Sequence, residues 1–105
     1  MLKINLEFRK GILFVRLKGY LTRYTYKCFE DYLIPLIKNH GIKYLVYNLE
    51  EVALMDSQGK KSLKKGITAA KKNKGKGGIC NAKKVLDNEF KAFENELAAI
   101  GELQF

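Results

Sequence analysis

The sequence predicts an α/β domain, built on a mixed and mostly parallel sheet of about four strands with helices packed on it. The first observation is the order of the expected elements, which is β-β-α-β-α-β-α. Strands that alternate with helices after an initial pair of strands are most simply joined in one mixed sheet. The second observation is that 47% of the 105 residues are hydrophobic, which is enough for one core. We therefore expect residues 1–105 to form a single domain.

The chain begins with an expected N-terminal β-hairpin. Apolar residues occupy every second position from 2 to 8, a pattern typical of a strand with one face exposed to water. Residues 9–11 predict a turn, and residues 12–18 form a second apolar segment of strand length. Gly19 interrupts this second strand.

The first helix is expected over residues 25–39. Thr25 suits the N-cap position, and apolar residues follow it at helical spacing. Pro35 lies inside this stretch, and an interior proline removes a hydrogen bond at a cost of about 3 kcal/mol. We therefore expect a kink or an early end at Pro35. His40-Gly41 is a suitable end for the helix.

The second half of the chain continues the alternation of strands and helices. Residues 42–48 are apolar with little alternation, which predicts a central strand covered on both faces. A second helix fits residues 58–72, because small and apolar residues share one of its faces while lysines lie largely elsewhere. We interpret residues 73–78 as a flexible connection, residues 79–81 as a short strand and residues 85–100 as a last helix. The apolar stripe of that last helix would be Leu86, Phe90, Phe93, Leu97 and Ile100.

The positive charge of the chain is concentrated in one segment. The formal net charge is +9, and residues 57–84 contain ten lysines and no acidic residue. A local basic patch indicates an anionic partner or a solvated face. Phosphate contacts need little beyond Lys and Arg, so a small lysine-rich nucleic-acid-binding protein is one alternative. No aromatic residue lies in the segment, so base stacking is unsupported and nucleic acid is the least favoured partner.

Several function classes find no support in the sequence. No run of 18 apolar residues is present and no secretory signal opens the chain, so we expect no membrane insertion. Cys28 and Cys80 are not at metal-ligand spacing, which favours a cytoplasmic protein with free thiols, although a bond between them stays open. His40 is the only histidine and is interpreted as a helix-end residue, so we expect no catalytic residue, metal or cofactor. The glycines at 75–78 lack the order of a phosphate-binding loop and predict a loose loop.

The motif Asp56-Ser57-Gln58-Gly59 stands where the central strand gives way to the second helix. We interpret Ser57 as the N-cap, whose hydroxyl accepts a hydrogen bond from a free N–H group, and Gly59 as a residue that lets the backbone turn or pack closely. A phosphate on Ser57 would add about −1.5 to −2 charges beside the helix N-terminus and the first lysines of the helix. The motif therefore predicts a docking surface with a switch at Ser57.

The stretch YLVYNLEEVALMDSQGKKSLKKG, residues 44–66, resembles the central segment of STAS domains of the anti-sigma factor antagonist type. In that family a buried strand ends in an apolar residue, a short loop follows, and D-S-x-G opens a helix. Asn48-Leu49 and residues 55–59 stand at the matching places. LKGYLTRYT, residues 17–25, resembles the strand-to-helix loop of the family. The resemblance covers about residues 4–81.

The resemblance implies a STAS-like domain that is not an enzyme and works as a partner switch. The unphosphorylated protein would bind an anti-sigma factor that is also a serine kinase, and a sigma factor would be freed for transcription. The kinase would phosphorylate Ser57 and be released, and a serine phosphatase would reset the protein. Asp56 would shape the loop and position the hydroxyl. The implied partner surface consists of Thr22, Arg23, Tyr24, Thr25, Met55, Asp56, Ser57, Gln58, Gly59, Lys60, Lys61 and Lys64.

The same resemblance leaves a second role open. A STAS domain can serve as a scaffold or adaptor subunit, for example in a stress-signalling or lipid-transport assembly, and bind without a phosphorylation cycle. The binding of such a protein to its partner would be indifferent to the state of Ser57.

Overall fold

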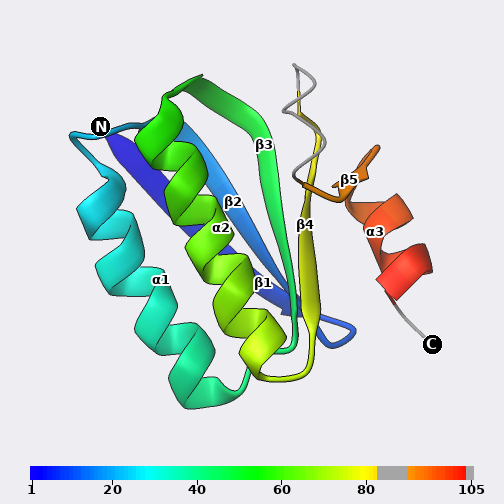
Figure 1. The fold of residues 1–105 in the computed structure, drawn as a ribbon. Helices are drawn as coiled ribbons and strands as arrows, with labels where there is room; N and C mark the ends of the chain where they lie inside the picture. Colours follow the sequence, from blue (N-terminus) through cyan, green and yellow to red (C-terminus); the bar gives the residue numbers. More distant parts are fainter. Residues whose placement is uncertain (83–89, 104–105) are drawn as a thin grey trace.

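The fold is a five-stranded mixed sheet with helices on both faces (Figure 1). It is seen in a computed structural model, which describes residues 1–82 and 90–103. The sheet order is β1-β2-β3-β4-β5, with β1 antiparallel to β2 and each other neighbouring pair parallel. The predicted α/β class, the hairpin and the mostly parallel sheet are thus confirmed, and a fifth, two-residue strand is added. The elements are β1 (Leu2–Arg9), β2 (Ile12–Leu21), α1 (Tyr26–His40), β3 (Tyr44–Met55), α2 (Ser57–Lys72), β4 (Lys76–Cys80), β5 (Ala92–Phe93) and α3 (Glu96–Leu103).

The hairpin forms as predicted, but β2 is longer than the sequence indicated. Lys10 and Gly11 both have positive φ, 53° and 81°, as a two-residue hairpin turn requires. β2 continues through Gly19 to Leu21, because Gly19 takes up φ 102° beside a shift in register with β3. A side chain at position 19 would collide with the carbonyl group of Met1, so glycine here lets the backbone at the start of the chain lie close against β2.

Helix α1 runs past Pro35 to His40, so the proline does not end it early. Pro35 lies on the exposed side of the helix, where the carbonyl that loses its N–H partner can turn to water. The helix ends at Gly41, which has left-handed φ and ψ of 60° and 35°. The N–H of Ile42 donates to the carbonyl of Ile37 at 3.1 Å, so the predicted end at His40-Gly41 is confirmed.

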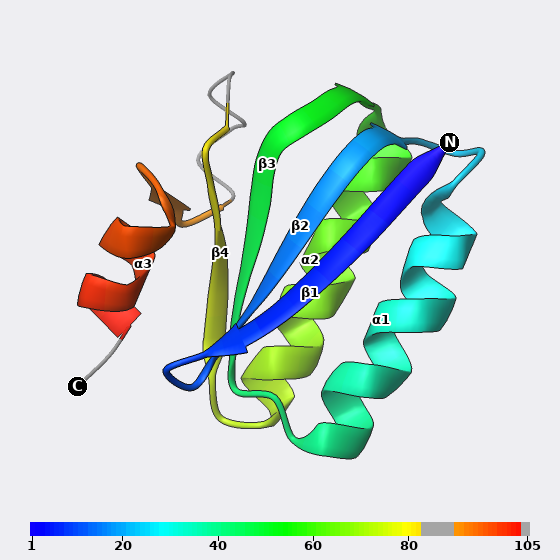
Figure 2. The ribbon, with the colours of Figure 1, turned by 180° about the vertical axis from the view of Figure 1, so that it is seen from behind.

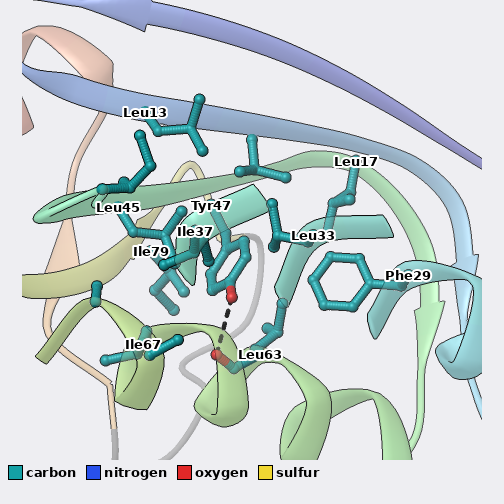
Figure 3. Packing of buried hydrophobic residues seen from close by; sticks show 14 of the residues in the cluster. Leu13, Leu17, Phe29, Leu33, Ile37, Leu45, Tyr47, Leu63, Ile67 and Ile79 are labelled. Carbon is teal, nitrogen blue, oxygen red and sulfur yellow. Dashed lines mark hydrogen bonds between the residues drawn. The ribbon is translucent and has the colours of Figure 1, made fainter. Parts of the chain in front are cut away.

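The larger core lies between the sheet and the two helices α1 and α2, with Tyr47 at its centre (Figure 3). Tyr47 is fully buried on β3, the middle strand, and its ring lies 5.9 Å from that of Phe29. Its hydroxyl donates to the carbonyl of Leu63 on α2 at 3.0 Å. Burial raises the pKa of the Tyr47 hydroxyl, so the group stays a neutral donor. This hydrogen bond ties α2 to the centre of the sheet.

The smaller core lies on the opposite face of the sheet, which Figure 2 shows in front of α1 and α2. Apolar residues of α3 pack there on β2, β3 and β4. At the start of α3, Glu96 accepts two hydrogen bonds from Arg16, at 2.8 and 2.9 Å, and one from Asn48 at 2.9 Å. Arg16 also pairs with Glu7 at 2.7 Å. The guanidinium of Arg16 holds the pKa of Glu96 below its ordinary value, and this network docks α3 on the sheet.

The predicted last helix over residues 85–100 is wrong for residues 90–95, whereas residues 96–100 are helical and belong to α3. Residues 83–89 and with them Leu86 lie outside the described residues. Phe90 precedes β5 and joins the larger core, whereas Phe93 lies in β5 and joins the smaller core on the opposite face of the sheet. Leu97 is 76% exposed. The helix starts only at Glu96, after Asn95 has capped it through a 2.8 Å bond from the N–H of Ala98.

The glycine-rich segment is also not the loose loop that the sequence indicated. Gly77 and Gly78 lie inside β4, paired with Leu45 and Val46 of β3. A side chain at position 78 would collide with the carbonyl of Lys91. The glycines allow the backbone of this buried strand to lie close to neighbouring backbone. The prediction of a flexible loop is wrong because glycine is also favoured where there is no room for a side chain.

Gly66→Ala should destabilise the domain by about 1–3 kcal/mol, because a methyl group there would overlap the Tyr47 hydroxyl in a closed core. The free energy of unfolding in urea measures the effect. Gly101→Ala is the matched control in α3, since nothing lies within 4 Å of its added carbon, and it should be neutral or stabilising. In a Tyr47→Phe background, Gly66→Ala should cost less; an equal cost in both backgrounds would contradict the assigned clash.

Glu96→Gln should flatten the dependence of stability on pH. The folded pKa of Glu96 is lowered, so its contribution is fully present above the ordinary value of 4.5 and is lost as pH falls through the folded pKa. Wild type should therefore exceed the variant in unfolding free energy at pH 7, and the gap should narrow as the pH falls below 4.5. Urea titrations at several pH values test this. Glu94→Gln, at an exposed position, should leave the profile unchanged.

Candidate functional site

The candidate site lies where β3 ends and α2 begins, and Asp56 organises it. The backbone of Asp56 is extended, with φ −100° and ψ −174°, and its Oδ1 accepts a hydrogen bond from the N–H of Gly59 at 2.9 Å. Asp56 is therefore the N-cap, and the sequence-based assignment of Ser57 to this position is wrong. Because Asp56 is extended, its carboxylate reaches the N–H of Gly59, the third residue of the helix. Ser57 is therefore the first helical residue.

The second carboxylate oxygen of Asp56 joins the site to the loop between β2 and α1. Oδ2 accepts from the N–H of Arg23 at 2.9 Å, and the N–H of Asp56 donates to the carbonyl of Leu21 at 3.4 Å. The N–H groups of Arg23 and Gly59 hold the pKa of Asp56 below its ordinary value, since both favour the charged carboxylate. One side chain thus holds together two loops that are 33 residues apart in sequence.

The loop at residues 22–25 is built around two threonine hydroxyls. Thr25 Oγ1 accepts from the N–H of Thr22 at 3.0 Å and donates to the carbonyl of Tyr20 at 2.8 Å. Thr25 occupies the predicted N-cap of α1, but its side chain closes the loop and makes no cap hydrogen bond. Thr22 is 7% exposed, and its Oγ1 accepts from the N–H of Tyr24 at 3.2 Å. The loop is held in shape independently of any partner.

The tip of this loop presents an aromatic ring to solvent. Tyr24 is 81% exposed, and the guanidinium of Arg23 lies 4.9 Å above its ring and donates to its hydroxyl at 2.8 Å. Such a pair combines a flat apolar surface with positive charge. Arg23 and Tyr24 are therefore the exposed members of the predicted surface on this loop.

Ser57 lies at the edge of the same region, with its side chain exposed. Its hydroxyl bonds to no described residue, which leaves it open to solvent. Gly59, two residues later, is buried, and a side chain there would collide with the carbonyl of Leu21. The first turn of α2 thus lies against the end of β2, and Ser57 stands at its outer end. The hydrogen bond between Arg23 and Asp56 brings residues 22–25 and 56–59 together.

The remaining members of the predicted surface differ in their positions. Met55 is half-buried and packs against the larger core, so it supports the loop from below. Lys61 is exposed, Lys60 is partly covered, and Lys64 lies 5.9 Å from the ring of Phe90, further along α2. Of the lysines, Lys60 and Lys61 are the nearest in sequence to Ser57.

Sequence reasoning missed two exposed apolar residues beside this site. Tyr20 and Leu54 are 49% and 57% exposed, and they are paired neighbours on β2 and β3. They lie beyond the points where these strands were expected to end, at residues 18 and 48. The pairing of β2 with β3 shifts between Gly19 and Tyr20, where β3 advances by two residues from Val52 to Leu54, and no local pattern in the sequence reveals this shift.

The described residues show neither a metal cluster nor a spanning helix. No group of three or more His, Cys, Asp and Glu side chains within residues 1–82 and 90–103 is placed to hold a metal ion. Over the same ranges no helix is long and apolar enough to cross a membrane. Cys28 is exposed, Cys80 is buried, and both are free thiols.

Known structures with the same fold include anti-sigma factor antagonists. One from Mycobacterium paratuberculosis has a TM-score of 0.81 at 20% identity, covering 98% of this chain and 94% of its own. The anti-sigma factor antagonist SpoIIAA in its unphosphorylated form has a TM-score of 0.78 at 18% identity, covering 95% and 96%. The Bacillus cell fate determinant SpoIIAA in its phosphorylated form has a TM-score of 0.67 at 17% identity, covering 98% and 89%. At these identities the likeness concerns the fold.

The same fold also occurs inside a transporter. The murine anion transporter Slc26a9 has a TM-score of 0.61 at 20% identity, over 75% of this chain but only 13% of the transporter. A likeness of fold therefore does not separate a switch from a scaffold. The family itself follows from the sequence: the family model of the STAS domain matches residues 3–96, and the chain belongs to the STAS-domain family.

Proposed function

We propose that this chain is an anti-sigma factor antagonist switched by phosphorylation of Ser57. Unphosphorylated, it binds an anti-sigma factor that is also a serine kinase, and a sigma factor is freed for transcription in the cytoplasm. The observation that carries the proposal is the exposed Ser57 side chain at the first residue of α2, beside a preformed loop. Family membership and the likeness to SpoIIAA, a protein with unphosphorylated and phosphorylated forms, support it. The role is one of binding, and the chain is not proposed to be an enzyme.

The proposed surface has an exposed part and a supporting part. Arg23, Tyr24 and Lys61 are exposed around Ser57 and meet the partner directly. Tyrosine and arginine side chains are enriched among the residues that dominate binding energies. Residues such as Thr22 and Gly59 are buried, so they shape the surface from below.

A phosphate on Ser57 changes this surface without unfolding the domain. The group adds about −1.5 to −2 charges beside the positive end of α2, where free N–H groups favour an anion. It also lies next to the Asp56 carboxylate, which already occupies the N–H groups of Gly59 and Arg23. The phosphate therefore stays at the outside of the turn. A partner packed over Ser57 would have to bury that charge, which is costly without a counter-charge, so the kinase leaves until a phosphatase removes the phosphate.

A non-switching scaffold is the second candidate. The likeness to one part of an anion transporter favours it, because there the same fold is a small part of a much longer chain. In that case Ser57 is an ordinary residue of the first turn, and the partner tolerates charge at this position. A nucleic-acid-binding role rests only on the lysines of residues 57–84.

Ser57→Asp should abolish retention of the kinase in a pull-down from lysate of the source cells, whereas wild type and Ser57→Ala should retain it. The added charge opposes burial, and we expect a loss of about tenfold or more in affinity. Intact-mass analysis after incubation with ATP should show one phosphate on wild type and none on Ser57→Ala.

Thr68→Asp is the matched control for charge, since Thr68 is exposed on α2 about three turns from Ser57. It should retain the kinase. If Ser57→Asp and Thr68→Asp retain the same partner and no phosphate appears, the scaffold role holds. Binding of duplex DNA that persists well above physiological salt would favour the nucleic-acid role instead.

Asp56→Ala should loosen both loops at once. The amides of Arg23 and Gly59 lose their acceptor, so their hydrogen exchange should accelerate, while amides in the middle of α1 keep their protection. Exchange measured by NMR tests this residue by residue. Glu51→Ala removes an exposed carboxylate of β3 and should change neither amide. Unchanged exchange in Asp56→Ala would mean that the loops hold their shape without it.

A further inference from the structure

Strand β1 has an open outer edge. It pairs with β2 on one side and forms the border of the sheet, as Figure 2 shows. No described residue hydrogen-bonds to the other side of its eight residues, Leu2–Arg9. An open edge of this length presents a row of free N–H and C=O groups and can accept another strand.

The direction of these backbone groups follows from the pairing with β2. The N–H of Tyr20 donates to the carbonyl of Met1 at 3.2 Å, so Met1 and Tyr20 form a hydrogen-bonded pair. In an antiparallel ladder such pairs recur at every second residue, so the odd-numbered residues of β1 point their backbone groups at β2. The even-numbered residues, Leu2, Ile4, Leu6 and Phe8, point theirs outward.

We propose that this edge binds the β1 strand of a second copy of the chain, antiparallel, about a two-fold axis at Asn5. We call the line along which the two β1 strands would pair the β1 seam. Only even-numbered residues can form backbone hydrogen bonds across it, so each must lie opposite another even-numbered residue. This condition places the two-fold axis at a residue, such as Ile4, Asn5 or Leu6, and not between two residues. An axis at Asn5 pairs the whole strand, with Leu2 opposite the second copy's Phe8 and Ile4 opposite its Leu6. The two sheets then form one continuous sheet.

The charges of β1 select the same axis. With the axis at Asn5, Lys3 lies opposite the second copy's Glu7, and the pair occurs twice. An axis at Leu6 would place Lys3 opposite Arg9, a like charge, and an axis at Ile4 would place it opposite Asn5. Lys3 is exposed, and Glu7 turns one oxygen to Arg16 at 2.7 Å, while the other lies 3.8 Å from Arg9 and can accept a further partner. Opposite charges that face each other across strands stabilise pairing, and like charges oppose it.

The apolar face of β1 is equally self-complementary. Leu2, Ile4 and Leu6 are partly buried against the larger core, and Phe8 is 62% exposed. In the proposed pairing Phe8 comes to lie against the second copy's Leu2, which covers it. Self-complementarity of one strand in backbone, charge and apolar contacts is the property expected of a two-fold interface, which favours a second copy over an unrelated strand.

Asn5→Cys in a Cys28→Ser background tests the axis directly. Residues opposite each other at a non-hydrogen-bonded position have Cα atoms about 4.5 Å apart, within the range of a disulfide. Mild oxidation should therefore convert most of this variant to a disulfide-linked dimer on a non-reducing gel. Lys3→Cys in the same background should not cross-link, because it would face Glu7. Equal cross-linking of both variants, or of neither, would overturn the proposed pairing.

Charge reversal tests the register in solution. Lys3→Glu and Glu7→Lys should each weaken self-association, by about tenfold, because like charges then meet twice. An equimolar mixture of the two variants should recover dimers. In a mixed dimer, the glutamate introduced at position 3 of one copy faces the lysine introduced at position 7 of the other. The second contact joins the native Lys3 and Glu7, so both contacts pair opposite charges.

Sedimentation equilibrium over a range of concentrations gives the masses, and circular dichroism verifies that Glu7→Lys is folded. A wild type that is monomeric at every concentration, or a mixture no more dimeric than its components, refutes the interface. Ser57→Asp should leave the dimer unchanged, which separates this inference from the proposed switch.

Discussion

Helix α2 can lie directly against the end of β2 and the first half of β3 because two positions on its inner face carry no side chain. Gly59 faces the carbonyl of Leu21, and Gly66 faces the hydroxyl of Tyr47. The two glycines are seven residues apart, which places them on one face of the helix. Since the helix is pinned at both points, its first residue, Ser57, has a fixed position at the end of the sheet. The placement of the candidate site therefore depends on core packing well below the surface.

Asp56 completes this arrangement at the surface. A capping carboxylate ordinarily serves one helix, but here its second oxygen holds the N–H of Arg23 on a different loop. The order of the loop at residues 22–25 comes mainly from its own threonines, so Asp56 sets the relation of the two loops more than the shape of either. This matters for any switch at Ser57. Charge added next to Asp56 acts on the hydrogen bonds that connect the two loops, while the core below stays packed.

The sequence predicted the parts of the fold in which local pattern and packing agree. The hairpin, α1 with its end at Gly41 and α2 have clear turn, cap or periodicity signals, and the central strand is a continuous apolar run of strand length; the structure confirms all four. The assignments failed where long-range packing decides. Glycines at 77 and 78 indicate a loop by propensity but lie in a buried strand, where neighbouring backbone leaves no room for side chains. Long-range packing also explains why the last helix was predicted to start too early. Phe90 and Phe93 have the spacing of one helical face, but Phe93 lies in β5 and the two rings belong to separate cores. At the cap, Asp56 and Ser57 are both good N-cap residues, and sequence alone does not say which one remains extended.

Net charge and local charge act in opposite directions when two copies of this chain approach. Each copy carries +9, so the copies repel each other at long range. Most of this charge belongs to residues 57–84, and α2 within them packs over β3 and β4, away from the open edge of β1. Repulsion between such distant lysines is screened within about 8 Å at physiological ionic strength. The Lys3–Glu7 contacts and the backbone hydrogen bonds of a β1 seam act at contact distance. Local complementarity at the edge, and not the overall charge, therefore decides whether two sheets join.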